Sequence, residues 1–204
     1  MDFKTEINEL ESTIFNDNYI IGIGNIPILF TAPHTMMQVR DDGSIKYEES
    51  YTKAIALYLN KYMNTSYMIK IKDTGEDSNK DNRDEFKKEL IRLVKDKNIK
   101  LIIDLHGASI TRDFDVELGT MNNLSADYST INELKEAFIE NGINNISIND
   151  PFKGGSITQY LYGIEDVDVI QLEINKKYRD ENNIDYLYKL IESLMSFINL
   201  YKKK

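Results

Sequence analysis

Short apolar runs alternate along the chain with longer segments of helical periodicity. The apolar runs predict strands at 19–23, 26–31, 67–71, 99–105, 114–121, 145–148 and 167–174. Apolar positions at helical spacing predict helices at 49–63, 83–95, 130–140, 156–162 and 184–201. Gly24 and Asn25, between the first two runs, predict a hairpin turn. Strands alternating with helices predict an α/β fold with a mixed, mostly parallel sheet flanked by helices.

The whole chain is expected to form one domain, residues 1–204. Its length supports a single core, and 41% of its residues are apolar. No internal repeat, low-complexity linker or shift in composition marks a boundary within it.

Charge and composition narrow the classes of function. The net charge of −9 disfavours binding to nucleic acids or to membrane surfaces, although a local basic pocket can still bind a small acid. The absence of cysteine excludes disulfides, thiolate zinc sites and cysteine nucleophiles. The N-terminal 13 residues lack an apolar core, and no apolar run reaches the roughly 18 residues of a membrane span. We therefore expect a cytoplasmic protein, of open oligomeric state.

The chain has only two histidines, and each directly follows an apolar strand. His34 follows the run at 26–31, and His106 follows the run at 99–105. Ligands bind outside the carboxyl ends of the strands in open α/β sheets, so neighbouring strands would place both imidazoles in one crevice. Imidazole suits zinc, which favours a metal site, although a single histidine at a strand end is more often solvated or hydrogen-bonded.

A third ligand is expected to be a carboxylate. Glu48 and Glu49 lie where the predicted helix at 49–63 begins, although acidic residues also favour this position through the helix dipole. Asp104 lies two residues before His106 and therefore on the same strand face, where it can orient the imidazole.

The strand at 167–174 has a polar face. Gln171, Glu173 and Asn175 alternate with apolar residues, which is also typical of a solvated strand. Beside a metal, Glu173 is a candidate general base. Arg112 and Arg179 are candidates to stabilise an oxyanion and to bind a substrate carboxylate, although isolated arginines more often form surface ion pairs.

Four ordered segments then resemble motifs of the N-formylglutamate amidohydrolase family, which belongs with the zinc carboxypeptidase-like and aspartoacylase-like hydrolases. These segments are Thr31-Ala32-Pro33-His34, Asp104-Leu105-His106-Gly107, Asn149-Asp150-Pro151-Phe152-Lys153-Gly154-Gly155 and Gln171-Leu172-Glu173-Ile174-Asn175. The resemblance spans roughly residues 28–180. It implies a zinc carboxypeptidase-like, or phosphorylase/hydrolase-like, fold.

The resemblance also implies roles for individual residues. One zinc ion is held by His34, His106 and Glu49, with Glu48 as the alternative carboxylate. Glu173 activates water and Arg112 assists it, while Asp115 lies beside the site. Arg179 is the candidate to bind the substrate carboxylate. The other residues expected to bind the substrate are Asn149, Gln171 and Asn175.

The expected function is zinc-dependent hydrolysis of the amide of a small N-acyl amino acid, such as N-formyl-L-glutamate. The partner is therefore a small acidic substrate. One alternative keeps the zinc but cleaves poly-γ-glutamate or a γ-glutamyl peptide. Another is a metal-binding sensor module without turnover.

Overall fold

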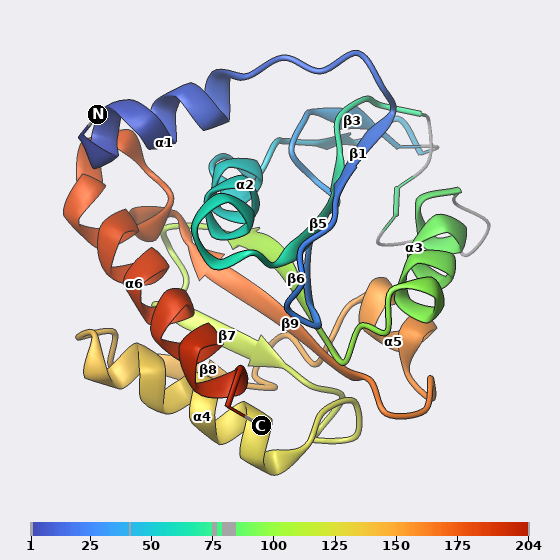
Figure 1. The fold of residues 1–204 in the computed structure, drawn as a ribbon. Coiled ribbons are helices and arrows are strands. Elements are labelled where there is room, and N and C mark those ends of the chain that lie inside the picture. The colour runs from blue at the N-terminus through green and yellow to red at the C-terminus, as the bar shows by residue number, and fades with distance from the viewer. Residues whose placement is uncertain (1, 41, 75–76, 79–84, 204) are drawn as a thin grey trace.

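A mixed seven-stranded sheet forms the centre of the molecule in the computed structural model, which describes residues 2–40, 42–74, 77–78 and 85–203 (Figure 1). The strand order is β1-β5-β2-β6-β9-β7-β8. The strands are β1 (Tyr19–Gly22), β2 (Ile28–Ala32), β5 (Ser66–Lys70), β6 (Leu101–Ala108), β7 (Val116–Gly119), β8 (Ile146–Ile148) and β9 (Asp168–Asn175). β5, β2, β6 and β9 are parallel, whereas β1 and the β7–β8 pair run the other way. The predicted α/β class with a mostly parallel, mixed sheet is confirmed.

Helices cover both faces of the sheet (Figure 1). One face carries α1 (Phe3–Ser12), α2 (Thr52–Met63), α4 (Tyr128–Glu140) and α6 (Ile184–Tyr201). The other face carries α3 (Glu85–Asp96) and α5 (Ser156–Leu161). Two short 3-10 helices, η1 (Lys176–Tyr178) and η2 (Glu181–Asn183), connect β9 to α6. None of the helices among the described residues combines the length and hydropathy of a bilayer span.

Alternation along the central strands decides which side chains face the site. In β6, Ile103 and Leu105 pack into the core beneath α2 and α6, whereas Ile102 packs into the core beneath α3 and α5. Asp104 and His106 therefore share the α3–α5 face with Ile102. The same alternation in β9 places Val169 and Glu173 on this face. The polar face predicted for β9 is thus buried rather than solvated.

The predicted hairpin between the first two strands is wrong. β5 lies between β1 and β2, because α2 carries the chain from β2 across the sheet to a parallel neighbour, as βαβ units do. Gly24 has another role: a Cβ there would lie 1.9 Å from the carbonyl oxygen of Asn64. Glycine at this position therefore leaves room for the backbone of the turn after α2. It does not form the turn of a hairpin between β1 and β2.

Two predicted boundaries also change at the site. β6 continues through His106 to Ala108, because β9 continues beside it and His106 pairs in register with Glu173. His106 thus lies within a strand rather than after it. The predicted helix at 49–63 begins only at Thr52, because Tyr51 adopts a left-handed conformation with φ of 65°. The predicted helix at 83–95 corresponds to α3, with Arg83 outside the described residues.

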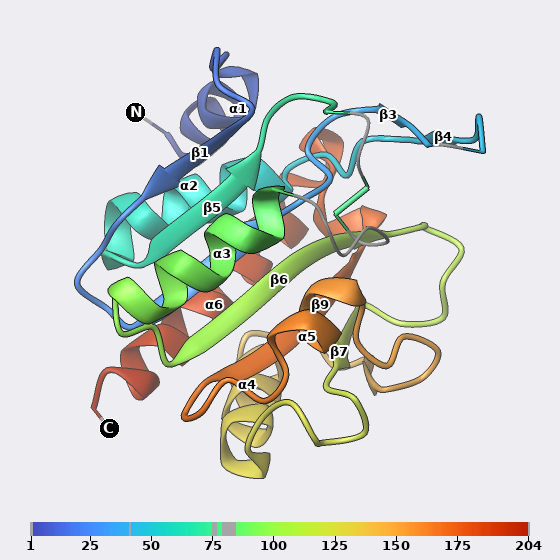
Figure 2. The same ribbon diagram turned by 90° about the vertical axis from the view of Figure 1, so that its right-hand side faces the viewer.

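Sequence patterns did not predict α1 or a small separate hairpin. The hairpin pairs β3 (Gln38–Val39) with β4 (Ile45–Lys46) in antiparallel fashion. Figure 2 shows it extending from the end of the sheet toward which β5 and β6 run. It follows His34 in the chain and places Lys46 against Glu49.

Candidate metal centre

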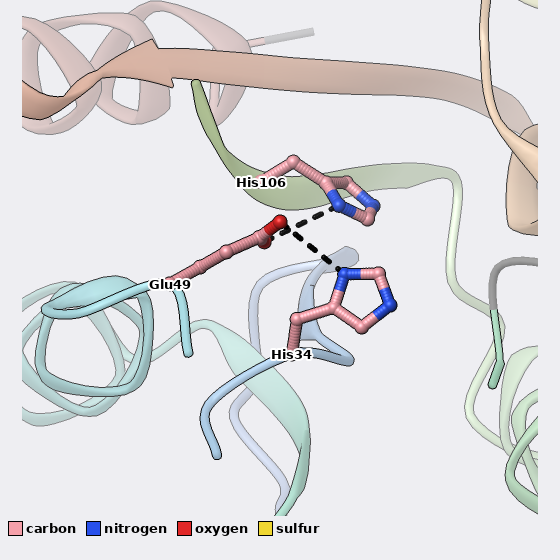
Figure 3. A group of neighbouring side chains, drawn as sticks. All are labelled: His34, Glu49 and His106. Atoms are coloured by element: carbon pink, nitrogen blue, oxygen red, sulfur yellow. Dashed lines mark ion pairs between the residues drawn. The ribbon is translucent and has the colours of Figure 1, made fainter. Parts of the chain in front are cut away.

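His34, Glu49 and His106 form one buried cluster (Figure 3). Their potential ligand atoms all lie within 4.8 Å of one another. Nδ1 of His34 lies 3.4 Å from Glu49 Oε1, and Nδ1 of His106 lies 3.4 Å from Glu49 Oε2. The two histidines meet because β2 and β6 are parallel neighbours, as the sequence analysis required. Glu48, the alternative carboxylate, is exposed outside the cluster.

Two aspartates hold the far nitrogens of the imidazoles. Nε2 of His34 lies 3.0 Å from Asp77 Oδ1, and Nε2 of His106 lies 2.9 Å from Asp104 Oδ2. An ionised carboxylate only accepts hydrogen bonds, so each Nε2 donates to its aspartate while each Nδ1 faces Glu49. The predicted contact of Asp104 is present, and Thr31 donates to its other oxygen at 2.6 Å. Asp77, which the sequence analysis missed, also accepts from Arg40 at 2.9 Å.

The turn before α2 aims Glu49 at the histidines. The Glu49 amide donates to the carbonyl of His34, and the Thr52 hydroxyl donates to the carbonyl of Glu49. The first helical turn of α2 is capped from outside, because Glu11 of α1 accepts from the amides of Tyr51 and Ala54. The left-handed residue and this external cap keep Glu49 outside the helix, where its side chain reaches the cluster.

The electrostatics of the cluster favour a cation. Burial raises the pKa of Glu49, but its interactions with His106 and His34 outweigh burial and hold this pKa well below the ordinary value. Burial lowers the pKa of His106, but the carboxylates of Asp104 and Glu49 outweigh it and hold this pKa well above the ordinary value. Three carboxylates thus surround two imidazoles. A bound proton or metal ion reduces the repulsion among these negative charges.

The residues fit a metal ion on their own geometry. Nδ1 of His34 and Oε2 of Glu49 are buried, and neither has a hydrogen-bond partner among the described residues. Buried polar atoms without partners are costly unless a ligand satisfies them. Two imidazole nitrogens, one carboxylate and supporting carboxylates behind the imidazoles match the donor set of a catalytic zinc site.

Glu173 lies in the cavity beside this cluster. The cavity has a volume of about 420 Å³ and is also lined by Glu49, His106 and Gln171. Gln171 Nε2 donates to Glu173 Oε1 at 2.8 Å, and Gln171 Oε1 is buried without a partner among the described residues. Burial raises the pKa of Glu173; the charge of His106 lowers it, and that of Glu49 raises it. A carboxylate of raised basicity therefore faces the same space as the candidate metal ligands.

Three cationic side chains line the same cavity: Lys46, Arg112 and Lys153. The Arg112 guanidinium lies over the ring of Phe152, 4.9 Å from its centre, which orients it at the cavity. Lys46 lies 2.5 Å from Glu49 Oε1. Lys46 and Lys153 were missed as site residues, because isolated surface lysines carry no pattern. The cavity wall thus carries three cationic side chains beside Glu49 and Glu173, although the protein as a whole is acidic.

The structure does not bring three predicted residues to the cavity wall. Asn149 and Asn175 bind loop backbone: Asn149 Oδ1 accepts from the Thr120 amide, and Asn175 Nδ2 donates to the Phe114 carbonyl. Arg179 is buried and donates to three carbonyls. None of the three lines the 420 Å³ cavity. Their roles in substrate binding stay predictions, and their contacts orient the side chains toward the backbone instead.

A larger cavity, of about 840 Å³, lies at the opposite end of the sheet. Its walls include Lys100 and Asp168, which stand at the beginnings of β6 and β9. It contains none of the residues predicted to act in catalysis, metal binding or substrate binding.

A second buried carboxyl group, Glu117, lies beside Glu173. The two residues are direct partners in the antiparallel β7–β9 ladder, so their side chains share a face. Glu117 Oε1 accepts from the Phe152 amide at 2.6 Å, whereas its buried Oε2 has no partner among the described residues. Burial raises the pKa of Glu117 to about 7, and the charge of Glu173 contributes. The alternation of polar and apolar residues around Glu117 was too short to predict whether this side chain is buried or solvated.

We expect Glu117→Gln to flatten the dependence of stability on pH. A carboxyl titrates near 4.5 in the unfolded chain and near 7 here, so between these values the folded chain binds the extra proton. The free energy of unfolding therefore falls as pH rises from about 4.5 to 7, by on the order of 1–3 kcal/mol from this group. Glutamine keeps the shape without the titration. Urea unfolding at several pH values measures the slope.

The exposed Glu140→Gln serves as the matched control and is expected to keep the parent's slope. An unchanged slope in Glu117→Gln would show that Glu117 is not protonated preferentially in the folded chain.

The part of the chain that contains His106 and Glu173 matches the model of a known protein family. The family model of N-formylglutamate amidohydrolase matches residues 82–178. The matched segment makes up 97 of the 204 residues, just under half of the chain. This segment contains His106, Arg112 and Glu173, so the resemblance stated from the sequence motifs is confirmed there. No curated protein matches the chain.

Solved structures extend the likeness to nearly the whole fold. The N-formylglutamate amidohydrolase from Ralstonia eutropha JMP134 is 12% identical, with a TM-score of 0.66, over 91% of this chain and 97% of that one. A bacteriophage poly-gamma-glutamate hydrolase is 15% identical, with a TM-score of 0.56, over 93% and 94%. A metallo-carboxypeptidase from Burkholderia cenocepacia is 10% identical, with a TM-score of 0.53, over 85% and 57%. At these identities the structures show a shared fold, so substrate must be argued from this chain's own cavity.

Proposed function

We propose that this protein is a zinc-dependent amidohydrolase that cleaves a small N-acyl amino acid such as N-formyl-L-glutamate. The observation that carries the proposal is that Glu173, His106 and Glu49 line one cavity. A candidate metal site and a carboxylate of raised pKa in one space are what metal-assisted hydrolysis requires. The match of residues 82–178 to the N-formylglutamate amidohydrolase family model supports the reaction class.

The chain's own residues divide the work of hydrolysis. When bound, a zinc ion supplies positive charge that polarises the amide carbonyl and acidifies a water molecule. Glu173 removes the proton of the attacking water, whose oxygen bonds to the carbonyl carbon. Glu173 then returns that proton to the amine nitrogen as the C–N bond breaks, which releases a carboxylic acid and the free amino acid. Arg112 stabilises the negative charge that forms on the carbonyl oxygen.

The cavity favours an acidic substrate of small size. Its volume of about 420 Å³ suits a small molecule. Lys153 offers an ammonium group that can pair with a substrate carboxylate. Gln171 Oε1, which has no partner among the described residues, can accept from a substrate N–H. The fold shared with the phage hydrolase makes a poly-γ-glutamate or γ-glutamyl substrate the second candidate.

A substrate panel tests the proposal. The zinc-loaded protein is given N-formyl-L-glutamate, N-formyl-L-methionine and poly-γ-glutamate, and released formate or amine is measured. We expect the monomeric acid to be cleaved best and the apolar analogue at least about tenfold less well, because the analogue lacks the side-chain carboxylate that can pair with Lys153. Faster cleavage of the polymer would favour the second candidate. Zinc binding without any turnover would support a sensor module and reject the proposal.

Lys153→Met is expected to raise the KM for N-formyl-L-glutamate by about 10- to 100-fold, because a hydrogen bond to a charged group is lost. The value of kcat should change little, since Lys153 does not contact the cluster of His34, Glu49 and His106 in the described interactions. Lys176→Met changes an exposed lysine away from the cavity and is the matched control. An unchanged KM in Lys153→Met would remove Lys153 from substrate recognition.

A further inference from the structure

Arg179 is a buried cation directly after η1, with 5% of its surface exposed. Its guanidinium donates to three backbone carbonyls. Nε donates to Ile174 at 3.0 Å, Nη1 to Ser50 at 2.8 Å and Nη2 to Ala108 at 3.2 Å. Burial lowers the pKa of Arg179, whereas the nearby carboxylates of Glu49 and Glu173 raise it.

The three carbonyls belong to three segments that each carry a site residue. Ser50 follows Glu49, Ala108 lies two residues after His106, and Ile174 follows Glu173. One planar group therefore connects the turn before α2 with the ends of β6 and β9. These segments are far apart in sequence, and the Ser50 contact alone spans 129 residues.

Gly107 provides the space for this guanidinium. A Cβ built on Gly107 would lie 2.4 Å from both Cζ and Nη2 of Arg179. Both atoms belong to a rigid planar group held by three hydrogen bonds, so neither can move without breaking them. Glycine is thus required directly after His106 because a larger residue would clash with Arg179, which the sequence motif did not reveal.

We propose that Arg179 is a positioning residue that fixes Glu49 and His106 relative to Glu173, and that Gly107 leaves the space in which its guanidinium lies. This inference rests on the metal site of the proposed function. Loss of the guanidinium frees the Ser50 turn and the end of β6, which disorders two ligands at once. Groups that orient metal ligands typically change metal affinity by 10- to 100-fold.

Metal affinity and the visible spectrum of the cobalt-substituted protein test the inference independently of turnover. We expect Arg179→Ala to weaken zinc binding by about 10- to 100-fold and to change the cobalt spectrum. Arg179→Lys should resemble Arg179→Ala, because one ammonium cannot bond three carbonyls in a plane. Arg92→Ala, which removes an exposed arginine of α3, should leave both readouts unchanged.

Two further measurements separate positioning from a general loss of stability. Added guanidinium should restore the cobalt spectrum and zinc affinity of Arg179→Ala, since the cavity that it leaves has the shape of that ion. Gly107→Ala should weaken zinc binding in the parent but add little in Arg179→Ala, because the clash is then gone. Rescue and non-additivity would support the proposal even if Arg179→Ala is less stable.

The outcomes also distinguish the two proposals. If the parent binds zinc and Arg179→Ala binds it equally well with an unchanged cobalt spectrum, the role of Arg179 is rejected and the proposed function stands. Additive effects of Gly107→Ala and Arg179→Ala without guanidinium rescue would likewise reject the role. If the parent binds no metal, both proposals are rejected.

Discussion

Replacing Glu173 with glutamine is expected to lower kcat by on the order of a thousandfold while the bound metal is retained. Glutamine keeps the size of the side chain, and its amide oxygen can still accept from Gln171 Nε2, which lies 2.8 Å from Glu173 Oε1. The change therefore removes the proton acceptor with little change in shape. Steady-state kinetics on N-formyl-L-glutamate, with metal content measured in the same preparation, provides the test.

Glu117 offers an internal check on this result, because it is a buried carboxyl group directly opposite Glu173 in the β7–β9 ladder. If Glu173→Gln keeps a rate within a few-fold of the parent, the assignment of the base is rejected. If that remaining rate then disappears in the double variant with Glu117→Gln, the base is Glu117. The exposed Glu140→Gln controls for the loss of one carboxylate.

Replacing His106 with glutamine is expected to remove metal binding, with an affinity loss on the order of a thousandfold or more. The structure assigns Nδ1 as the nitrogen that faces Glu49 and Nε2 as the nitrogen that binds Asp104. A glutamine amide reaches roughly the position of Nε2, so it can still donate to Asp104 but offers no ligand at Nδ1. Loss of a direct ligand should exceed the 10- to 100-fold effect of a supporting residue.

Asparagine at the same position is the matched variant, because its amide reaches roughly the position of Nδ1. His106→Asn should therefore bind metal more tightly than His106→Gln, although it loses the contact with Asp104. Zinc affinity by chelator competition and metal content by elemental analysis measure both variants, and circular dichroism confirms that they fold. The reverse order of affinities would assign Nε2 as the ligand atom, and equal binding in all three proteins would reject the metal site. Corresponding variants of His34 should follow the same order.

Local patterns predicted the parts of this fold that depend on neighbours in sequence. The continuous apolar run at 99–105 identified β6, and helical spacing gave α6 its observed bounds, Ile184–Tyr201. The two histidines were paired correctly because parallel strands end at the same edge of a sheet. Asp104 was also found, since alternation alone places it beside His106.

Features set by distant contacts were not predictable in the same way. The placement of β5 between β1 and β2 depends on a crossover helix and not on the turn residues Gly24 and Asn25. Asp77 lies outside the helices and strands and Lys46 lies in the two-residue strand β4, so neither belongs to a segment long enough to show periodicity. Arg179 was predicted to bind the substrate carboxylate because it is a basic residue close to the polar strand in sequence, whereas its N–H groups in the structure donate to carbonyl groups.

The position of β9 in the sheet has a consequence for synthesis of the chain. β9 joins the four-strand unit β1-β5-β2-β6 to the β7–β8 pair, and residues 168–175 are made after all of those strands (Figure 1). β2, which ends two residues before His34, and β6, which carries His106, can pair before β9 emerges from the ribosome. The edge of β7 that pairs with β9 in the folded protein then has no partner. Unpaired strand edges favour pairing with other chains. A chain interrupted before residue 168 would therefore expose two such edges, on β6 and on β7, and aggregate through them.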